Sequence, residues 1–175
     1  YNSTGSNNVM IGWKAGQGVL AASAVGNAIY IGKNAGYNTE AGVGSVCIGR
    51  DAGYNPTGNY NTFIGYLAGG GAWADATSTH NVGIGNNVMD AVMNNALGNT
   101  SMGYKALQQV TSGDYNTAIG YEAGNDIVSG HNNVLIGHQA GDKSSAGGYT
   151  VIIGDNAGGA DFTSGADGMV LIGAS

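Results

Sequence analysis

The chain has 175 residues, of which 34 are Gly, one is Pro and one is Cys. Eleven Asp and Glu against five Lys and Arg give a formal net charge of −6, which argues against nucleic acid and anionic membrane surfaces as partners, since both attract clustered cations. A single Cys excludes an internal disulfide and a Cys-based zinc site, and no apolar run approaches the ~18 residues of a membrane span. Gly is so frequent that helix is disfavoured as the main element.

An internal repeat dominates the chain. An Ile-Gly pair, replaced once by Met102-Gly103, recurs ten times at intervals of 16–20 residues, and we call the Gly of each pair the repeat glycine. Counted from this residue as position 0, the repeat has the consensus Asn-(Val/Thr)-x-Ile-Gly-x-x-Ala-Gly. Both ends of the chain fall inside a repeat, so we expect one repetitive domain, residues 1–175, cut from a longer fibre. The repeat glycines are Gly12, Gly32, Gly49, Gly65, Gly85, Gly103, Gly120, Gly137, Gly154 and Gly173.

Each repeat predicts one short strand. Position −1 is Ile in nine repeats and Met102 in the other, and position −3 is β-branched in all ten. Two such positions at period two describe one face of a strand, which we expect to point into the coil. Ala at position +3 and Gly at position +4 are typical of a narrow interior and of a corner with positive φ. Asn at position −4 of six repeats predicts a ladder of stacked side chains.

The length of the repeat decides the architecture. A period of 16–20 residues is too short for helical repeats or propeller blades and suits one coil of a solenoid. The sequence therefore predicts an all-β parallel β-solenoid of about ten coils, roughly 45–50 Å long. A second, shorter strand near position +3 is expected to close each coil. The longest repeats predict loops that project at Gln17–Ala24 and Gly70–Thr79.

So thin a coil buries few large side chains in its own interior. To be stable it therefore needs to bury a further apolar surface against another molecule. We expect position −2 to point away from the interior, where it forms an uncharged and mainly apolar stripe. A stripe to which every coil contributes is simplest to cover with further parallel copies of the chain. We expect three copies, although the stripe alone does not fix their number. The predicted contact residues of this homotrimer are Met10, Tyr30, Cys47, Phe63, Ala118, Leu135, Ile152 and Leu171.

The repeats resemble a known family. Asn-Thr-Ala-Ile-Gly-Tyr-Glu-Ala-Gly at 116–124 and its relatives at 61–69 and 133–141 resemble the YadA-like heads of trimeric autotransporter adhesins. They resemble the NTAIGYxAG repeats of bacteriophage tail fibres even more closely. The resemblance implies a left-handed parallel β-roll assembled as a homotrimer. Intervals of 16–20 residues are longer than the usual adhesin head repeat, which favours the phage fibre.

The resemblance also implies a function. We expect a structural and adhesive segment of a virion tail fibre, outside the cell, which binds a carbohydrate or protein receptor on the host cell surface. Two alternatives stay open: the head of a trimeric adhesin on a bacterial surface, and a tailspike that degrades polysaccharide.

Chemistry other than binding has little support in the sequence. The acidic residues are scattered through turns without a recurring pair, and neither a Gly-x-Ser-x-Gly elbow nor a Gly-Gly-x-Gly-x-Asp calcium repeat occurs. We therefore expect no enzyme, no metal site and no cofactor. Thr62, Thr100 and Thr117 are expected to face inward, which argues against an ice-binding surface. Cys47 is expected to act as a small buried hydrophobe.

Position +1 offers candidate receptor contacts. It is expected to point outward, and it combines aromatic rings with hydrogen-bonding groups that suit sugars. The alternative is that these rings stack on one another or seal the contact between copies. The candidate contacts are Trp13, Tyr66, Tyr104, Tyr121 and His138, together with Trp73 in the longest loop.

Overall fold

The computed structural model describes residues 5–18, 25–39, 42–55, 58–71, 78–143, 146–159 and 167–174. Each repeat contributes one strand of three residues, which spans positions −3 to −1. The strands are β1 (Val9–Ile11), β2 (Ile29–Ile31), β3 (Val46–Ile48), β4 (Thr62–Ile64), β5 (Val82–Ile84), β6 (Thr100–Met102), β7 (Thr117–Ile119), β8 (Val134–Ile136), β9 (Val151–Ile153) and β10 (Val170–Ile172).

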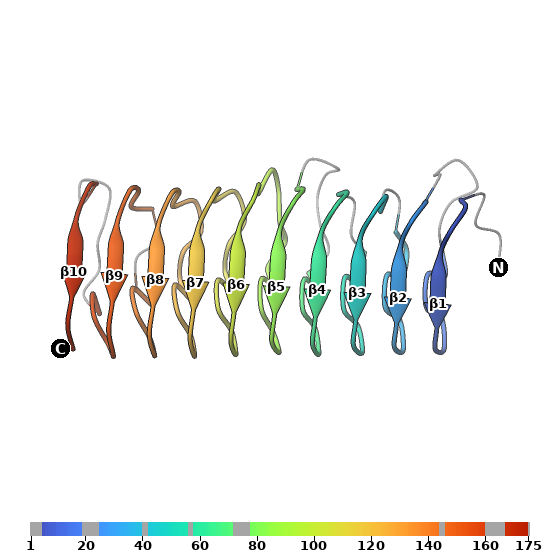
Figure 1. Cartoon of the computed structure of the whole chain (residues 1–175), viewed down its shortest axis with the longest axis horizontal. Helices are drawn as coiled ribbons and strands as arrows, with labels where there is room; N and C mark the ends of the chain where they lie inside the picture. Colours follow the sequence, from blue (N-terminus) through green and yellow to red (C-terminus); the bar gives the residue numbers. More distant parts are fainter. Residues whose placement is uncertain are drawn as a thin grey trace.

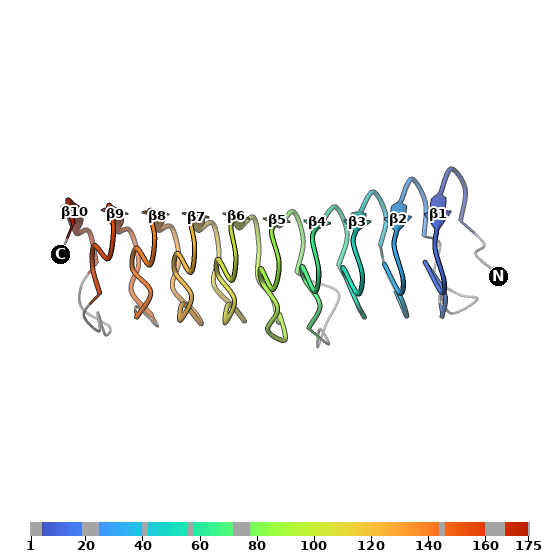
Figure 2. The same ribbon diagram turned by 90° about the horizontal axis from the view of Figure 1, so that it is seen from below.

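The strands form one parallel sheet in the order of the sequence, β1 to β10 (Figure 1). Pairing is in register, so that Cys47 of β3 lies opposite Phe63 of β4 and Ile48 lies opposite Ile64. Viewed at a right angle (Figure 2), the sheet forms one side of a rod, and the rest of each coil extends from its other side. The register therefore brings the same repeat position of successive coils into one column.

The predicted all-β parallel β-solenoid is confirmed, and the described residues contain no helix, hence none that could span a bilayer. The solenoid has about eight turns, against the ten or so coils that the sequence predicted. Residues near position +3 form turns, so the second, shorter strand that was predicted there does not form. These turns still stack through backbone hydrogen bonds, such as Gly36 N to Ala52 O at 2.9 Å. The loops expected to project lie mostly outside the described residues, at 19–24 and 72–77.

Side chains at position −2 fill the interior of the solenoid. Phe63, Leu135 and Ile152 are fully buried, whereas the positions −3 and −1 that flank them are only half-buried. The prediction that position −2 points outward and contacts other copies is therefore wrong, because its side chains are covered by their own chain. This correction applies to Met10, Tyr30, Cys47, Phe63, Ala118, Leu135, Ile152 and Leu171.

The two end members of that set, Met10 and Leu171, are only partly buried but pack against the same core. Cys47 is buried as expected, and burial raises the pKa of its thiol to about 12. The thiol therefore stays protonated near neutral pH and contributes as a small apolar group.

Side chains at positions −2 and +4 fill the interior together, and a large residue at one position occurs with a small residue at the other. A large residue at position −2 faces glycine at position +4: the ring of Phe63 takes the space that a Cβ on Gly69 would need. In the next coil position −2 is Gly83, and position +4 is Met89, which is fully buried. Positions −2 and +4 therefore share one cross-section of the core, and their combined size is limited by close packing.

Asparagine side chains at position −4 form a buried ladder along the rod. Asn99 donates both its backbone N–H and its side-chain Nδ2 to Oδ1 of Asn81, each at 3.0 Å. The same Nδ2 donates to the carbonyl of Gly113 at 2.7 Å. Buried polar groups are costly when unpaired, so this pairing stabilises the stack and confirms the predicted ladder. Its members are Asn61, Asn81, Asn99, Asn116 and Asn133, followed by Thr150.

The repeat glycine permits the close approach of successive coils. Its φ lies between 128° and 143° in all ten repeats, a region that residues with a Cβ rarely adopt. A Cβ on Gly120 would also overlap the carbonyl oxygen of Gly137 in the next coil. Both constraints require glycine at this position, and together they fix the register of the stack.

We predict that Gly120→Ala destabilises the fold strongly. The unfavourable φ alone costs about 1–3 kcal/mol, and the overlap with the Gly137 carbonyl adds to that cost. Gly147→Ala is the matched control, since a Cβ there would have no atom within 4 Å. Chemical unfolding of the two variants at equal protein concentration measures the difference. Equal stability of the two variants would contradict the assigned role of the repeat glycine.

Candidate functional site

The outward side of the sheet is an uncharged, mainly aliphatic surface, which we call the apolar face. It consists of the first and last residue of each strand, at positions −3 and −1. Ile11, Met102 and Ile119 are 59%, 48% and 39% exposed, and most of the others are half-buried. Ten strands at the usual spacing make this face about 45 Å long. A continuous exposed apolar surface of this length is unusual for a monomer and marks a contact with another molecule.

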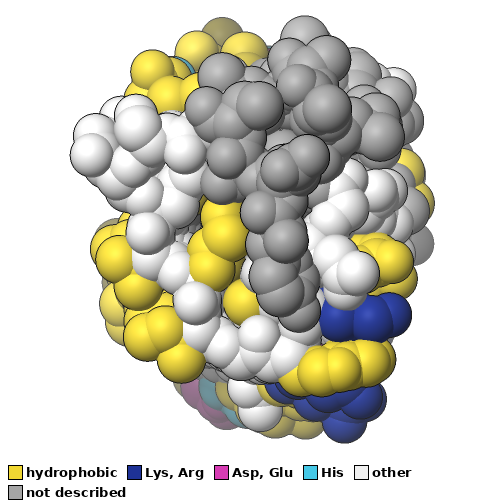
Figure 3. Space-filling model, turned by 90° about the vertical axis from the view of Figure 1, so that its right-hand side faces the viewer, with side chains coloured by type: hydrophobic (Ala, Val, Ile, Leu, Met, Phe, Trp, Pro, Cys, Tyr) yellow, Lys and Arg dark blue, Asp and Glu magenta, His cyan; other side chains and the backbone are white. Residues whose placement is uncertain are grey.

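Figure 3 looks along the rod from the β1 end. Hydrophobic side chains gather along the flank that the sheet forms, at the left of the view, while Lys and Arg side chains lie at the lower right. Positions −3 and −1 carry no Asp, Glu, Lys or Arg in any of the ten strands, so the residues of the apolar face are uncharged along its whole length.

Three threonines interrupt position −3 of the apolar face: Thr62, Thr100 and Thr117. They point outward, so the prediction that they face inward is wrong for the same reason as that for position −2. Each is paired in the sheet with a neighbouring coil, and the parallel column at position −1 is entirely Ile apart from Met102. The face is therefore predominantly aliphatic rather than an array of hydroxyl groups.

The edge that follows the strands carries position +1, and we call this column the trailing edge. Tyr104 stacks on Tyr121 with ring centroids 5.1 Å apart, and Tyr121 stacks on His138 at 5.3 Å. Nδ1 of His138 lies 3.0 Å from Oδ1 of Asp155 in the next coil. These side chains form a continuous outward column over four coils, and their ring faces are largely occupied by one another.

The trailing edge is cationic near the β1 end. Nζ of Lys14 lies 4.5 Å and Nζ of Lys33 lies 5.2 Å from the ring centre of Trp13, and the Trp13 side chain is 60% exposed. These distances are typical of cation–π contacts. An exposed indole with two ammonium groups forms a patch suited to a ligand that carries negative charge.

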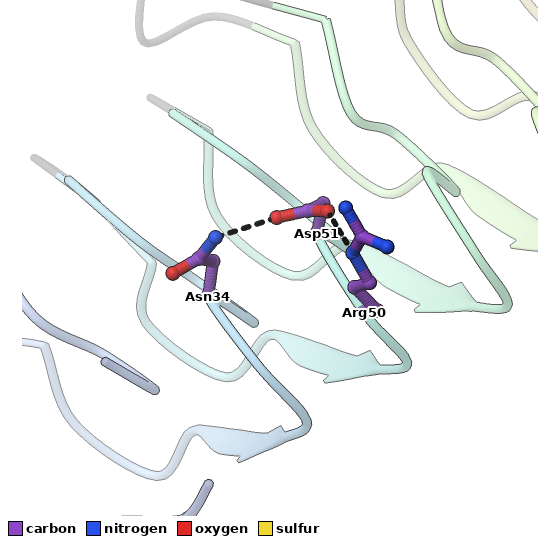
Figure 4. Close-up of polar contacts among 3 residues, drawn as sticks. All are labelled: Asn34, Arg50 and Asp51. Carbon is purple, nitrogen blue, oxygen red and sulfur yellow. Dashed lines mark hydrogen bonds and ion pairs between the residues drawn. The ribbon is translucent and has the colours of Figure 1, made fainter. Parts of the chain in front are cut away.

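Arg50, also on the trailing edge, is neutralised within the chain. Figure 4 shows its Nε directed at Oδ2 of Asp51, 2.9 Å away, while Asn34 of the preceding coil donates its Nδ2 to Oδ1 of Asp51 at 2.7 Å. The Arg50 guanidinium also lies over the ring of Tyr66, at 5.4 Å. The carboxylate is thus held from two coils, and Arg50 adds little net charge to the patch around Trp13.

The opposite edge carries position −5, just before each strand, and we call this column the leading edge. All ten residues have positive φ, between 55° and 78°. Six are Asn or Gly, which adopt this region readily. The remaining four are exposed aromatic or imidazole side chains: Tyr60, His80, Tyr115 and Tyr149. These four residues were not among the expected site residues, although bulky side chains at a position otherwise held by Asn and Gly are a detectable signal.

Two carboxyl groups have raised pKa values. Burial raises the pKa of Asp90 to about 6. Burial also raises the pKa of Asp142, with Lys143 opposing and Asp126 and Glu122 adding to the shift. Asp90 follows β5 and Asp142 follows β8, so they are separated by three coils, about 14 Å. This separation exceeds that of the paired carboxylates of glycosidases. Within the described ranges, no three His, Cys, Asp or Glu side chains converge as metal ligands.

The structure places the candidate receptor contacts on one column. Trp13, Tyr66, Tyr104, Tyr121 and His138 all lie on the trailing edge and are exposed. Trp73 lies outside the described residues.

Comparison with known proteins leaves the site to be interpreted from its geometry. No protein-family model matches the chain, and searches of curated proteins and of solved structures give no match either.

Proposed function

We propose that the chain is a rigid structural segment of a cell-surface-binding fibre, in which three parallel copies bury their apolar faces against one another. The observation that carries this proposal is the apolar face itself, which is uncharged at all of its positions and extends over all ten strands. Removal of an apolar surface of this size from water stabilises an assembly that buries it.

A further copy of the same chain is the best partner for this face. Its two columns repeat at the strand spacing of about 4.8 Å, and only a molecule with the same repeat and length matches it at every coil. Copies related by rotation about an axis parallel to the rod present the same residues to one another at every height. The number three comes from the resemblance of the repeats to trimeric fibre and adhesin heads.

The class of fibre is proposed from the repeats. The Asn-Thr-Ala-Ile-Gly-Tyr-Glu-Ala-Gly segment at 116–124 resembles tail-fibre repeats, and the 16–20 residue intervals support a bacteriophage fibre over an adhesin head. In such a fibre the rod holds receptor contacts away from the virion. A carbohydrate or protein receptor on the host cell surface is its partner.

The patch around Trp13 is the best-supported receptor contact on the trailing edge. The stacked rings of Tyr104, Tyr121 and His138 present mainly their edges, whereas Trp13 is widely exposed beside Lys14 and Lys33. We propose that this patch binds a sugar that carries a carboxylate.

Replacement of two residues of the apolar face should dissociate the assembly without unfolding the coil. In Ile64→Asp with Ile136→Asp, two outward side chains become charged, and buried unpaired charges are not tolerated at a contact between copies. Light scattering should give a trimer for the parent chain and a monomer for this variant. Circular dichroism should report an unchanged fold.

Neighbouring residues in the same two strands provide the matched control. Phe63→Asp with Leu135→Asp places the charges in the interior, so this variant should lose its fold instead. Val92→Asp with Val128→Asp adds the same charges to exposed side chains outside the sheet and should remain trimeric. A monomeric parent chain, or an Ile64 and Ile136 variant that stays trimeric, would contradict the proposed assembly.

Trp13→Ala should weaken binding to acidic bacterial surface glycans. Loss of the exposed indole removes both its own contact and the support of the two lysines, and we expect about a tenfold rise in Kd, or ~1.4 kcal/mol. An array of neutral and uronic-acid-containing glycans measures the effect, with Val92→Ala as a control outside the trailing edge. Equal binding by the two variants would remove Trp13 from the proposal.

A further inference from the structure

The leading edge holds bulky side chains in a backbone conformation that disfavours them. Tyr60, Tyr115 and Tyr149 have φ values of 58°, 55° and 56°, where Asn and Gly stand in most other coils. Left-handed backbone is unfavourable for residues with a large side chain. The coil holds other large side chains at the same φ, such as Lys14, Leu67 and Lys105, so the tyrosines of the leading edge are distinguished by their exposed rings.

The chain covers only part of these rings: Tyr60 lies against Gly44 and Tyr115 against Gly98. The side chains of Tyr60, Tyr115 and Tyr149 are 52%, 59% and 61% exposed. Tyr60 stacks on His80 with ring centroids 5.2 Å apart, and Tyr149 meets His131 edge-on, but Tyr115 has no ring partner among the described residues. These side chains still offer most of their surface for a contact outside the chain.

Symmetry indicates what lies next to the leading edge. The leading and trailing edges lie on opposite sides of the apolar face. In Figure 1 they correspond to the turns that precede the strands and the turns that follow them. When parallel copies turn their apolar faces to a common axis, the leading edge of one copy meets the trailing edge of the next. Positions −5 and +1 of the same strand then meet at the same height. This holds for any number of copies related by rotation about that axis.

We infer that the two edges form a second contact between neighbouring copies, which rests on the proposed assembly. Two strands carry tyrosine on both edges: Tyr60 and Tyr66 flank β4, and Tyr115 and Tyr121 flank β7. Each of these pairs brings together two exposed phenol rings from different copies, and aromatic pairs are favourable beyond the area they bury.

The polar residues of the two edges fit the same arrangement. The leading edge carries no Asp, Glu, Lys or Arg, so no charge of the trailing edge meets a like charge. In this arrangement Lys33 faces Asn27, and Asp155 faces Tyr149, whose phenol group is able to donate to a carboxylate. Because the edges differ from coil to coil, the neighbours of each edge residue depend on which coils lie side by side.

An antiparallel pair of copies would bring different residues together. Its leading edges would meet each other with the order of coils reversed. Since β4 and β7 are equidistant from the middle of the ten-strand sheet, Tyr60 of one copy would then lie beside Tyr115 of the other. The two arrangements therefore predict different neighbours for the same side chain.

Cross-linking of cysteine pairs tests the inference. Tyr115→Cys with Tyr121→Cys places one thiol on each edge of β7, and a short bismaleimide should link the copies into a covalent trimer on a denaturing gel. Within one copy the two thiols lie on opposite edges of the sheet, two residues before and two residues after β7, and a link between them would leave a monomer on the denaturing gel. Cys47 is buried and protonated and therefore does not react.

Three controls accompany this variant. Tyr115→Cys alone and Tyr121→Cys alone should remain uncross-linked, because like edges do not meet in the parallel arrangement. Tyr60→Cys with Tyr115→Cys places both thiols on the leading edge and should also give no product. Tyr60→Cys with Tyr66→Cys repeats the main test at β4, should the β7 variant fail to fold by circular dichroism.

The outcomes separate the two proposals. A covalent trimer from the pairs at β7 and β4, without product from the controls, supports the contact. Product from the leading-edge pair, or no product from any pair in a chain that light scattering finds trimeric, overturns the edge contact and leaves the assembly standing. A monomeric parent chain overturns the proposed assembly, and the edge contact with it.

Discussion

Every other feature of this structure depends on the close approach of successive coils at the repeat glycine. A Cβ on Gly120 would overlap the carbonyl oxygen of the next coil, and the same relation holds from Gly12 to Gly154. This contact allows no variation in register, since each strand pairs with the next at identical repeat positions. A repeat of 16–20 residues therefore becomes a set of straight columns, and differences in length are absorbed in the turns.

Within a column each side chain lies about 4.8 Å from a similar side chain in the next coil. This spacing explains why the chain contains few charged residues. Amides gain from such stacking, because each Asn both donates and accepts along the ladder, and aromatic rings gain as well. Like charges would repel at that distance. Only 9% of the residues are charged, and where Arg50 follows Lys33 on the trailing edge, Asp51 neutralises it.

The periodicity of the sequence was sufficient to predict the strands, their parallel stacking and the Asn ladder, but not which side of each strand faces inward. A strand of three residues has one side chain on one face and two on the other, and alternation alone does not decide between the faces. The deciding signal is compensation in size: Gly83 occurs with Met89, and Ser101 with Leu107, so positions −2 and +4 share the interior. The Ile column was misassigned because two apolar or β-branched positions at period two were taken to face the interior. The core instead varies from coil to coil, while the outward column stays constant.

In the proposed assembly this contrast between uniform and varied columns has a physical consequence. The apolar face is nearly identical in every coil, so by itself it stabilises copies shifted along the rod by one coil almost as well as copies in register. The edges lack this translational symmetry, since Tyr60 is followed by His80 and then Gly98 along one edge, and Tyr66 by Asn86 and then Tyr104 along the other. A shift of one coil would keep the apolar contact but exchange the neighbours at the edges, so that Tyr115 would lie beside Tyr104 or His138 in place of Tyr121. Affinity then comes mainly from the face, while the edges are the part of the contact whose neighbours change with the register.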